Sequence, residues 1–138
     1  MSELPETAQA ESIIKNWLTA IVDTASERDH STHMNLISKK VNLVGVPGFD
    51  SIGFDDWSRQ CQHEFEIELI SDIQYQGLKV RAATDSRIMF ITHETIIAND
   101  GTKKQQGVEC LLELEDDGIW RLTQQRIMSD EETAHYLS

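Results

Sequence analysis

The segment Asp116-Asp117-Gly118-Ile119-Trp120-Arg121-Leu122 decides how the second half of this chain folds. An Asp-Gly pair followed at once by an aromatic residue and an alternating apolar pattern is a strong signal for a β-hairpin. Two further polar turns stand upstream, at residues 84–86 and 99–101. Together the three turns predict an antiparallel meander of four strands, over residues 71–83, 87–98, 102–115 and 119–128. Gly77, inside the first of these strands, is a candidate β-bulge.

A helical pattern precedes the strands. Between residues 10 and 25, apolar side chains recur at intervals of three and four, as they do on the buried face of an amphipathic helix. The stripe consists of Ala10, Ile13, Ile14, Trp17, Leu18, Ile21, Val22 and Ala25. The elements expected between this helix and the meander are a short helix over residues 30–38, a strand over 41–46 and a helix that starts near Asp55. Helices first and an antiparallel sheet afterwards predict the α+β class, with the helices packed on one face of the sheet.

Length and composition indicate one globular domain over residues 1–138. The chain is 39% hydrophobic and 26% charged, a balance typical of soluble domains. Residues 1–8 are expected to be a peripheral, flexible lead-in, and residues 130–138 are expected either to begin a short helix or to stay flexible. No apolar run approaches the ~20 residues of a membrane span, and the acidic N-terminus does not resemble a signal peptide. We therefore expect a cytoplasmic protein that has no membrane partner.

Charge and motif content exclude several classes of function. The 12 basic and 24 acidic residues leave a net charge of −12, which repels phosphate backbones, so no nucleic-acid partner is expected. Cys61 and Cys110 are far apart and do not have the spacing of metal ligands. His30 and His33 have helical i, i+3 spacing, but the sequence offers no evident third ligand. The chain carries no nucleotide- or cofactor-binding fingerprint, so neither a metal nor a cofactor is expected.

Both faces of the strand over residues 87–98 mix apolar and polar side chains. One face presents Ile88, Phe90, Thr92, Glu94 and Ile96, and the other presents Met89, Ile91, His93, Thr95 and Ile97. An antiparallel sheet with one solvated face should instead alternate cleanly between apolar and polar residues. We therefore expect helices to cover one face of the sheet and a second subunit to cover the other, which would make the protein a homodimer.

The order of these elements, together with three local signatures, resembles one known superfamily. The signatures are Asp117-Gly118-Ile119-Trp120-Arg121-Leu122 at the entry to the last strand, Glu27-Arg28-Asp29 between the first two helices, and Pro47-Gly48-Phe49 ahead of Asp55-Asp56-Trp57. Over residues 10–128 the chain resembles the nuclear transport factor 2-like superfamily, which includes the SnoaL-like proteins. The resemblance implies a cystatin-like cone, in which a strongly curved, mostly antiparallel sheet wraps around the N-terminal helices and leaves a pocket between them.

The resemblance does not select one activity. Members of this superfamily include isomerases, cyclases, dehydratases, transport adaptors and ligand-binding or assembly domains, and a shared fold does not imply a shared function. The steroid isomerases of the superfamily use a tyrosine hydroxyl beside an aspartic acid as their oxyanion hole. The tyrosines of this chain are Tyr75 and Tyr136, and Trp17 stands in the first helix instead. A faithful copy of that site is therefore not expected.

Arg126 is the main candidate for ligand binding. It shares strand parity with Trp120, Leu122 and Gln124, so if Trp120 points into the cone, Arg126 is expected to point there too. A buried arginine can hold a carboxylate or a similar anion through two parallel hydrogen bonds. Trp17, Trp57 and Trp120 are expected to form apolar walls of the pocket. The alternative for Arg126 is a surface position or a structural ion pair.

Three residues are candidates for acid–base catalysis. Glu109 lies on the strand beside Arg126 and is expected to pair with it across the sheet, or to act as a general base if it is buried. His93 lies in the middle of a strand and can titrate near neutral pH, although a histidine among apolar neighbours is more often a core residue. Asp29 matches the helix junction where catalytic members of the superfamily often place an acid, but capping of the second helix is the favoured role.

These residues support three hypotheses about function. The leading one is a binding protein for a small, partly apolar organic molecule that can be anionic. The second is a cofactor-free isomerase, cyclase or dehydratase that uses acid–base residues in the same pocket. The third is a dimeric assembly module whose cone is filled by side chains.

Overall fold

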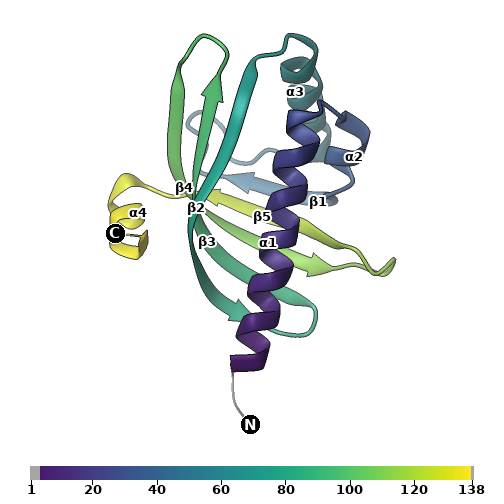
Figure 1. The fold of residues 1–138 in the computed structure, drawn as a ribbon, viewed down its shortest axis with the longest axis vertical. Helices are drawn as coiled ribbons and strands as arrows, with labels where there is room; N and C mark the ends of the chain where they lie inside the picture. The colour runs from purple at the N-terminus through teal and green to yellow at the C-terminus, as the bar shows by residue number, and fades with distance from the viewer. Residues whose placement is uncertain (1–3, 138) are drawn as a thin grey trace.

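The computed structural model describes residues 4–137, with side chains from residue 8 onward (Figure 1). The helices are α1 (Leu4–Ser26), α2 (His30–Met34), α3 (Phe54–Glu66) and α4 (Asp130–Leu137). The strands are β1 (Ile37–Val44), β2 (Ile70–Ala83), β3 (Arg87–Ala98), β4 (Lys103–Leu114) and β5 (Trp120–Ile127). The element order is the expected one, although α1 begins well ahead of its apolar stripe. Within residues 4–137, no helix combines the length and the apolar character needed to cross a bilayer.

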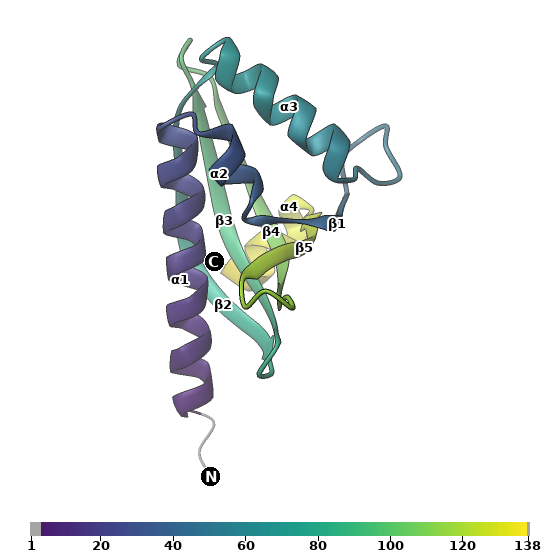
Figure 2. The same cartoon turned by 90° about the vertical axis from the view of Figure 1, so that its right-hand side faces the viewer.

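The five strands form one mixed, curved sheet in the order β1-β5-β4-β3-β2. β1 runs parallel to β5, and every other pair of neighbouring strands is antiparallel. α1 lies along one face of the curved sheet, and α3 stands at the same end of the molecule as the tip of the β3–β4 hairpin (Figures 1 and 2). This arrangement confirms the predicted α+β class, with the N-terminal helices inside a curved, mostly antiparallel sheet.

The apolar stripe of α1 forms one side of the hydrophobic core, as predicted. Ala10, Ile14, Trp17 and Ile21 are all buried. They pack against side chains from the concave face of the sheet, which are Ile88, Phe90, Val108, Cys110, Leu112 and Leu122. Full burial of a large apolar side chain contributes about 1.5–3 kcal/mol. Burial of the stripe therefore fixes α1 as one wall of the cone.

An irregularity in β5 changes which of its side chains face the interior. Leu122 and Gln124 pair with consecutive residues of β4, so Thr123 between them is the extra residue of a β-bulge. A shift of one residue turns every following side chain to the opposite face of the sheet. Trp120 therefore faces the concave side, whereas Gln124 and Arg126 face the convex side. The expectation that all three residues share the inner face is wrong, because it assumed regular alternation.

The C-terminal residues form α4, which packs on the convex face of the sheet (Figure 2). Thr133 of α4 lies so close to Gly107 of β4 that a Cβ atom on this glycine would clash with the threonine hydroxyl. Arg126 of β5 forms an ion pair with Glu132 of α4 at 3.0 Å. Part of the face that was expected to contact a second subunit is thus covered by the chain itself. The homodimer stays a prediction.

Candidate functional site

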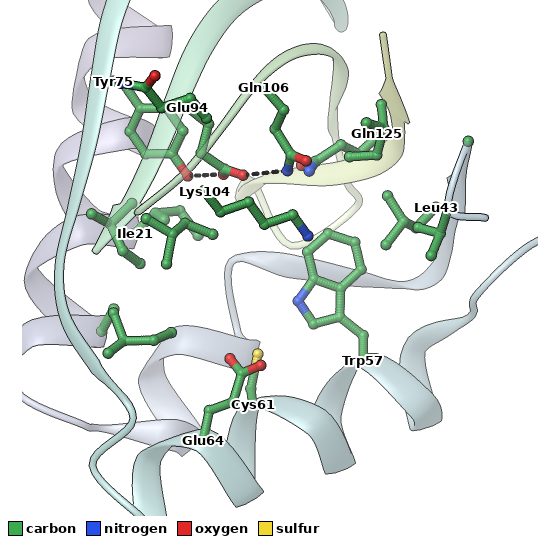
Figure 3. Close-up of a pocket in the computed structure, with 18 of the residues that line it drawn as sticks. Ile21, Leu43, Trp57, Cys61, Glu64, Tyr75, Glu94, Lys104, Gln106 and Gln125 are labelled. Atoms are coloured by element: carbon green, nitrogen blue, oxygen red, sulfur yellow. Dashed lines mark hydrogen bonds between the residues drawn. The ribbon is translucent and has the colours of Figure 1, made fainter. Parts of the chain in front are cut away.

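An open cavity of about 630 Å³ lies between α1, α3 and the concave face of the sheet (Figure 3). This volume falls within the range of about 300–1,000 Å³ that small-molecule sites occupy. Much of the wall is apolar or aromatic, with contributions from Trp17, Ile21, Ile37, Trp57, Phe65 and Ile73. The cone is therefore not filled by side chains, unlike the cone expected of an assembly module.

Glu94 of β3 is the polar centre of the cavity. Tyr75 of β2 donates its hydroxyl to Glu94 Oε2 at 2.8 Å, and Gln106 of β4 donates its Nε2 to Glu94 Oε1 at 2.9 Å. Strand register explains the alignment, because both residues are direct cross-strand partners of Glu94. Figure 3 shows the resulting row, with Glu94 between its two donors.

Glu94 is buried and has no positive partner among the described residues. Its exposed fraction is only 7%, and both side chains that contact its carboxylate are neutral donors. Among the ion pairs of the described residues, none involves Glu94. A buried carboxylate is costly unless a cation or hydrogen bonds compensate it. A buried carboxylate that two donors align inside a cavity makes this a candidate functional site.

Tyr75 can act only as a hydrogen-bond donor to Glu94. Burial raises the pKa of the Tyr75 hydroxyl well above its usual value, and the negative charge of Glu94 raises it further. The hydroxyl therefore keeps its proton near neutral pH. Its role is to hold and orient the carboxylate.

His33 of α2 also lines the cavity but is neutral near pH 7. Burial is the main reason that the pKa of His33 falls to about 4, and the positive charge of His30 lowers it further. Its Nδ1 lies 2.8 Å from the hydroxyl of Thr24, and its ring meets Phe65 edge to face. His33 is thus a hydrogen-bonded core residue, and it supplies no cation to the cavity.

Neither cysteine has the character of a nucleophile. Burial, followed by the charge of Glu64, raises the pKa of Cys61 to about 12. Burial, followed by the charges of Glu94 and Glu109, raises the pKa of Cys110 well above its usual value. Both thiols therefore stay protonated, and protonated thiols are poor nucleophiles.

Charged side chains also approach the cavity from α3 and from β4. Trp57, Cys61 and Glu64 follow one another at i, i+4 and i+7 on α3, so this face of the helix points into the cavity. Glu64 accepts a hydrogen bond from the Nε2 of Gln60 at 2.8 Å. Lys104, near the start of β4, also lines the cavity. In the described part of the chain, no three histidine, cysteine or acidic side chains gather as a metal site would require.

The structure divides the sequence-predicted ligand-binding residues into two groups. Trp17 and Trp57 line the cavity. The indole nitrogen of Trp17 also donates a hydrogen bond to the backbone carbonyl of Leu36, between α2 and β1. Trp120 faces the concave side but lines a separate groove beside the first half of α1. Arg126 and Gln124 lie outside the cavity on the convex face, as a consequence of the bulge at Thr123.

The predicted catalytic residues lie apart from the cavity as well. Glu109 does pair with Arg126, with 3.3 Å between Oε1 and Nε, but the pair lies on the convex face. His93 lies beneath α4 on that same face. Asp29 caps α2 by accepting a hydrogen bond from the backbone of Thr32. The side chain of Thr32 and, after it, this backbone contact lower the pKa of Asp29. Capping, the favoured alternative for Asp29, is the role that the structure shows.

Sequence reasoning missed Tyr75, Glu94 and Gln106. The sequence pattern puts Glu94 on one face of its strand together with apolar residues, and an acidic residue in such a position is an available signal. Tyr75 carries no comparable local signal. What brings the three side chains together is the register between β2, β3 and β4, which a single sequence does not display.

Comparison with known proteins shows which solved structures share this architecture. No protein-family model matches the chain, and no curated relative matches it. Among solved structures, a candidate dehydratase of the NTF2-like family from Streptomyces avermitilis is 17% identical, with a TM-score of 0.63 over 87% of this chain and 95% of that one. A candidate scytalone dehydratase from Novosphingobium aromaticivorans is 8% identical, with a TM-score of 0.71 over 90% of this chain and 86% of that one.

A third solved structure has a similar fold. ActVI-ORFA from Streptomyces coelicolor is 12% identical, with a TM-score of 0.69 over 88% of this chain and 97% of that one. At such low identities the likeness concerns the fold and not the activity. It agrees with the element order and the curved mixed sheet found here. The chain therefore has the fold of the nuclear transport factor 2-like superfamily.

Proposed function

We propose that this protein is a cofactor-free acid–base enzyme of the isomerase, cyclase or dehydratase type, acting on a small, partly apolar organic molecule. Glu94 is its general base. The observation that carries the proposal is a carboxylate that is 7% exposed, lines the cavity and, among the described residues, accepts side-chain hydrogen bonds only from neutral donors. A base in such a setting is oriented and weakly solvated, which are the conditions that favour proton abstraction.

The proposed reaction begins when Glu94 removes a proton from a carbon beside a carbonyl or a hydroxyl-bearing carbon. Tyr75 and Gln106 keep the carboxylate oriented through one hydrogen bond to each oxygen. Each oxygen retains a second lone pair for the incoming proton. In an isomerisation the double bond shifts, and Glu94 returns the proton to another carbon. In a dehydration the electron pair of the broken C–H bond forms a C=C bond, the C–O bond breaks, and the departing hydroxyl group takes the proton from Glu94 and leaves as water. Trp17 and Trp57 contribute apolar walls against which the substrate packs.

Two further observations favour this function over the other hypotheses. The solved structures with the same fold include two candidate dehydratases. The open cavity argues against the assembly module, which predicted a filled cone. A simple binding protein would need complementarity but would not need a buried carboxylate aligned by two donors.

A proton-abstraction probe tests the role of Glu94 without knowledge of the natural substrate. In 5-nitrobenzisoxazole, a base takes the ring C–H proton, the N–O bond breaks, and a coloured nitrile phenolate forms. We expect saturable turnover by the wild-type protein and a loss of about 100-fold or more in Glu94→Gln. Glu109→Gln removes a carboxylate from the convex face and serves as the matched control, which should keep the wild-type rate. Equal rates for Glu94→Gln and the wild type would overturn the proposal.

A further inference from the structure

The charged side chains of the cavity are unevenly balanced. Three carboxylates line it, from Glu64, Glu94 and Asp130, whereas Lys104 is the only lysine or arginine among its described lining residues. His33 is neutral near pH 7 because burial holds its pKa at about 4. The three carboxylates and one ammonium leave an excess of two negative charges.

The two inner carboxylates lack a cation of their own. Among the described side chains, Glu94 accepts hydrogen bonds only from Tyr75 and Gln106, and Glu64 only from Gln60. In the part of the chain that the structure describes, neither glutamate takes part in an ion pair. A positively charged ligand would therefore give these carboxylates the cationic partner that they lack among the described residues.

The cavity also contains the aromatic surfaces that favour a cation. Trp57 lies on the same face of α3 as Glu64, and Trp17, Phe65 and Tyr75 form other parts of the wall. The faces of aromatic rings attract ammonium groups, most strongly where water is excluded. A net charge of −12 on the whole chain adds a long-range attraction for cations and a repulsion of anions.

We propose that the substrate carries a protonated amine on an apolar body of one or two rings. The ammonium group pairs with Glu64 beside Trp57, while the apolar body extends towards Glu94, on the opposite side of the cavity from α3 (Figure 3). This assignment rests on the proposed function, because it places the substrate in the same cavity and leaves Glu94 free to act as the base. It also reverses the earlier expectation of an anionic ligand, whose anchor Arg126 faces the convex side.

The positive charge of Lys104 would repel a bound ammonium group and so weakens the case for an amine. Lys104 lines the cavity but is solvent-exposed, so its repulsion of a bound ammonium group is screened by water. Glu94, by contrast, is buried and acts through a medium that screens less. The carboxylates therefore outweigh Lys104 in the interior of the cavity.

Three probes of nearly equal shape test the charge preference. They are 2-naphthylmethylamine, 2-naphthalenemethanol and 2-naphthoate, which are cationic, neutral and anionic at pH 7, and calorimetric titration measures their affinities. We expect the amine to bind about 10-fold more tightly than the alcohol, and the naphthoate to bind most weakly. A naphthoate that binds as tightly as the amine would overturn the assignment without any variant being needed.

Variants of charged residues in and near the cavity test where the ammonium group of the amine binds. Glu64→Gln should weaken the preference for the amine and leave binding of the alcohol unchanged. Glu66→Gln is the matched control, because Glu66 lies exposed on the same helix outside the cavity lining, and it should keep the preference. Lys104→Gln should strengthen amine binding. A Glu64→Gln protein with the wild-type preference would overturn the placement of the ammonium beside Trp57.

The experiments distinguish a failure of the substrate assignment from a failure of the catalytic role proposed for Glu94. The elimination probe is neutral, so it reports on Glu94 whatever the charge preference of the cavity. Elimination that depends on Glu94 without a preference for the amine overturns only the substrate assignment. A preference for the amine without elimination overturns only the catalytic role of Glu94.

Discussion

Tyr75 and Gln106 hold the carboxylate of Glu94 in a fixed orientation, so the stability of the protein should depend on both donors. We expect Tyr75→Phe to lower the free energy of unfolding by about 1–3 kcal/mol, because it leaves an oxygen of a buried carboxylate without its donor. Urea denaturation measures this change. Tyr136→Phe removes a hydroxyl from α4 on the convex face and is the matched control. A Tyr75→Phe protein as stable as the wild type would show that the hydrogen bond contributes nothing.

His33 should make the protein sensitive to mild acid. Its pKa is about 4 in the folded state, below its ordinary value of 6.5, so folding favours the neutral ring. The unfolded chain therefore gains a proton at His33 as the pH falls below 6.5, while the folded protein does not until about pH 4. Stability from this residue is fully present above pH 6.5 and is lost as the pH falls towards 4.

The size of this effect can be measured between pH 7 and pH 5. Linkage predicts that His33 alone lowers the free energy of unfolding by about 2 kcal/mol across that interval. His33→Gln cannot titrate, so its stability should change less over the same interval, whatever its absolute value. Urea denaturation of both proteins at the two pH values gives the comparison. Parallel changes in the two proteins would show that other groups cause the acid sensitivity.

At the scale of elements, two bulges show what one sequence can and cannot predict. The bulge at Gly77 was predicted, and the structure confirms it with a register shift and a φ of 75°, a conformation that glycine adopts readily. The bulge at Thr123 carries no such signal, because threonine suits a regular strand. It is defined by how β5 pairs with β4, which is a contact between distant parts of the chain.

This difference explains why the fold was easier to predict than the candidate site. The helical stripe of α1 and the Asp-Gly turn before β5 depend on neighbouring residues, so local patterns reveal them. The row of Tyr75, Glu94 and Gln106 depends on the register of three strands. The bulge at Thr123, which the sequence does not predict, turns Arg126 to the convex face and so outside the expected pocket.

The packing of α4 on the sheet gives a test at the same scale. Gly107→Ala adds a methyl group that would clash with Thr133, so we expect it to displace α4 and to lower stability by about 1–3 kcal/mol. Hydrogen exchange in residues 130–137 should increase. Thr133→Ala removes the hydroxyl and methyl groups that the new side chain meets, so the double variant should recover part of the loss. Unchanged exchange in Gly107→Ala would show that α4 does not depend on this contact.

At the scale of the whole molecule, α4 limits how a second subunit can bind. A standard interface buries about 800 Å² of each partner, and α4 already occupies part of the convex face. The remaining surface of that face includes Gln124, which is exposed, and half-buried Met89. A homodimer through the sheet must therefore use the strands beside α4, or contact α4 itself.

Light scattering decides whether the predicted homodimer forms. We expect a mass of twice 15.7 kDa at micromolar concentration. Gln124→Arg places a charge on the convex face and should shift the mass towards the monomer, because an unpaired charge is costly to bury at an interface. Asn16→Arg places the same charge on an exposed position of α1 and should leave the dimer intact. A wild-type mass of 15.7 kDa contradicts the dimer, and dissociation caused by Asn16→Arg alone would place the interface on the helical side of the cone.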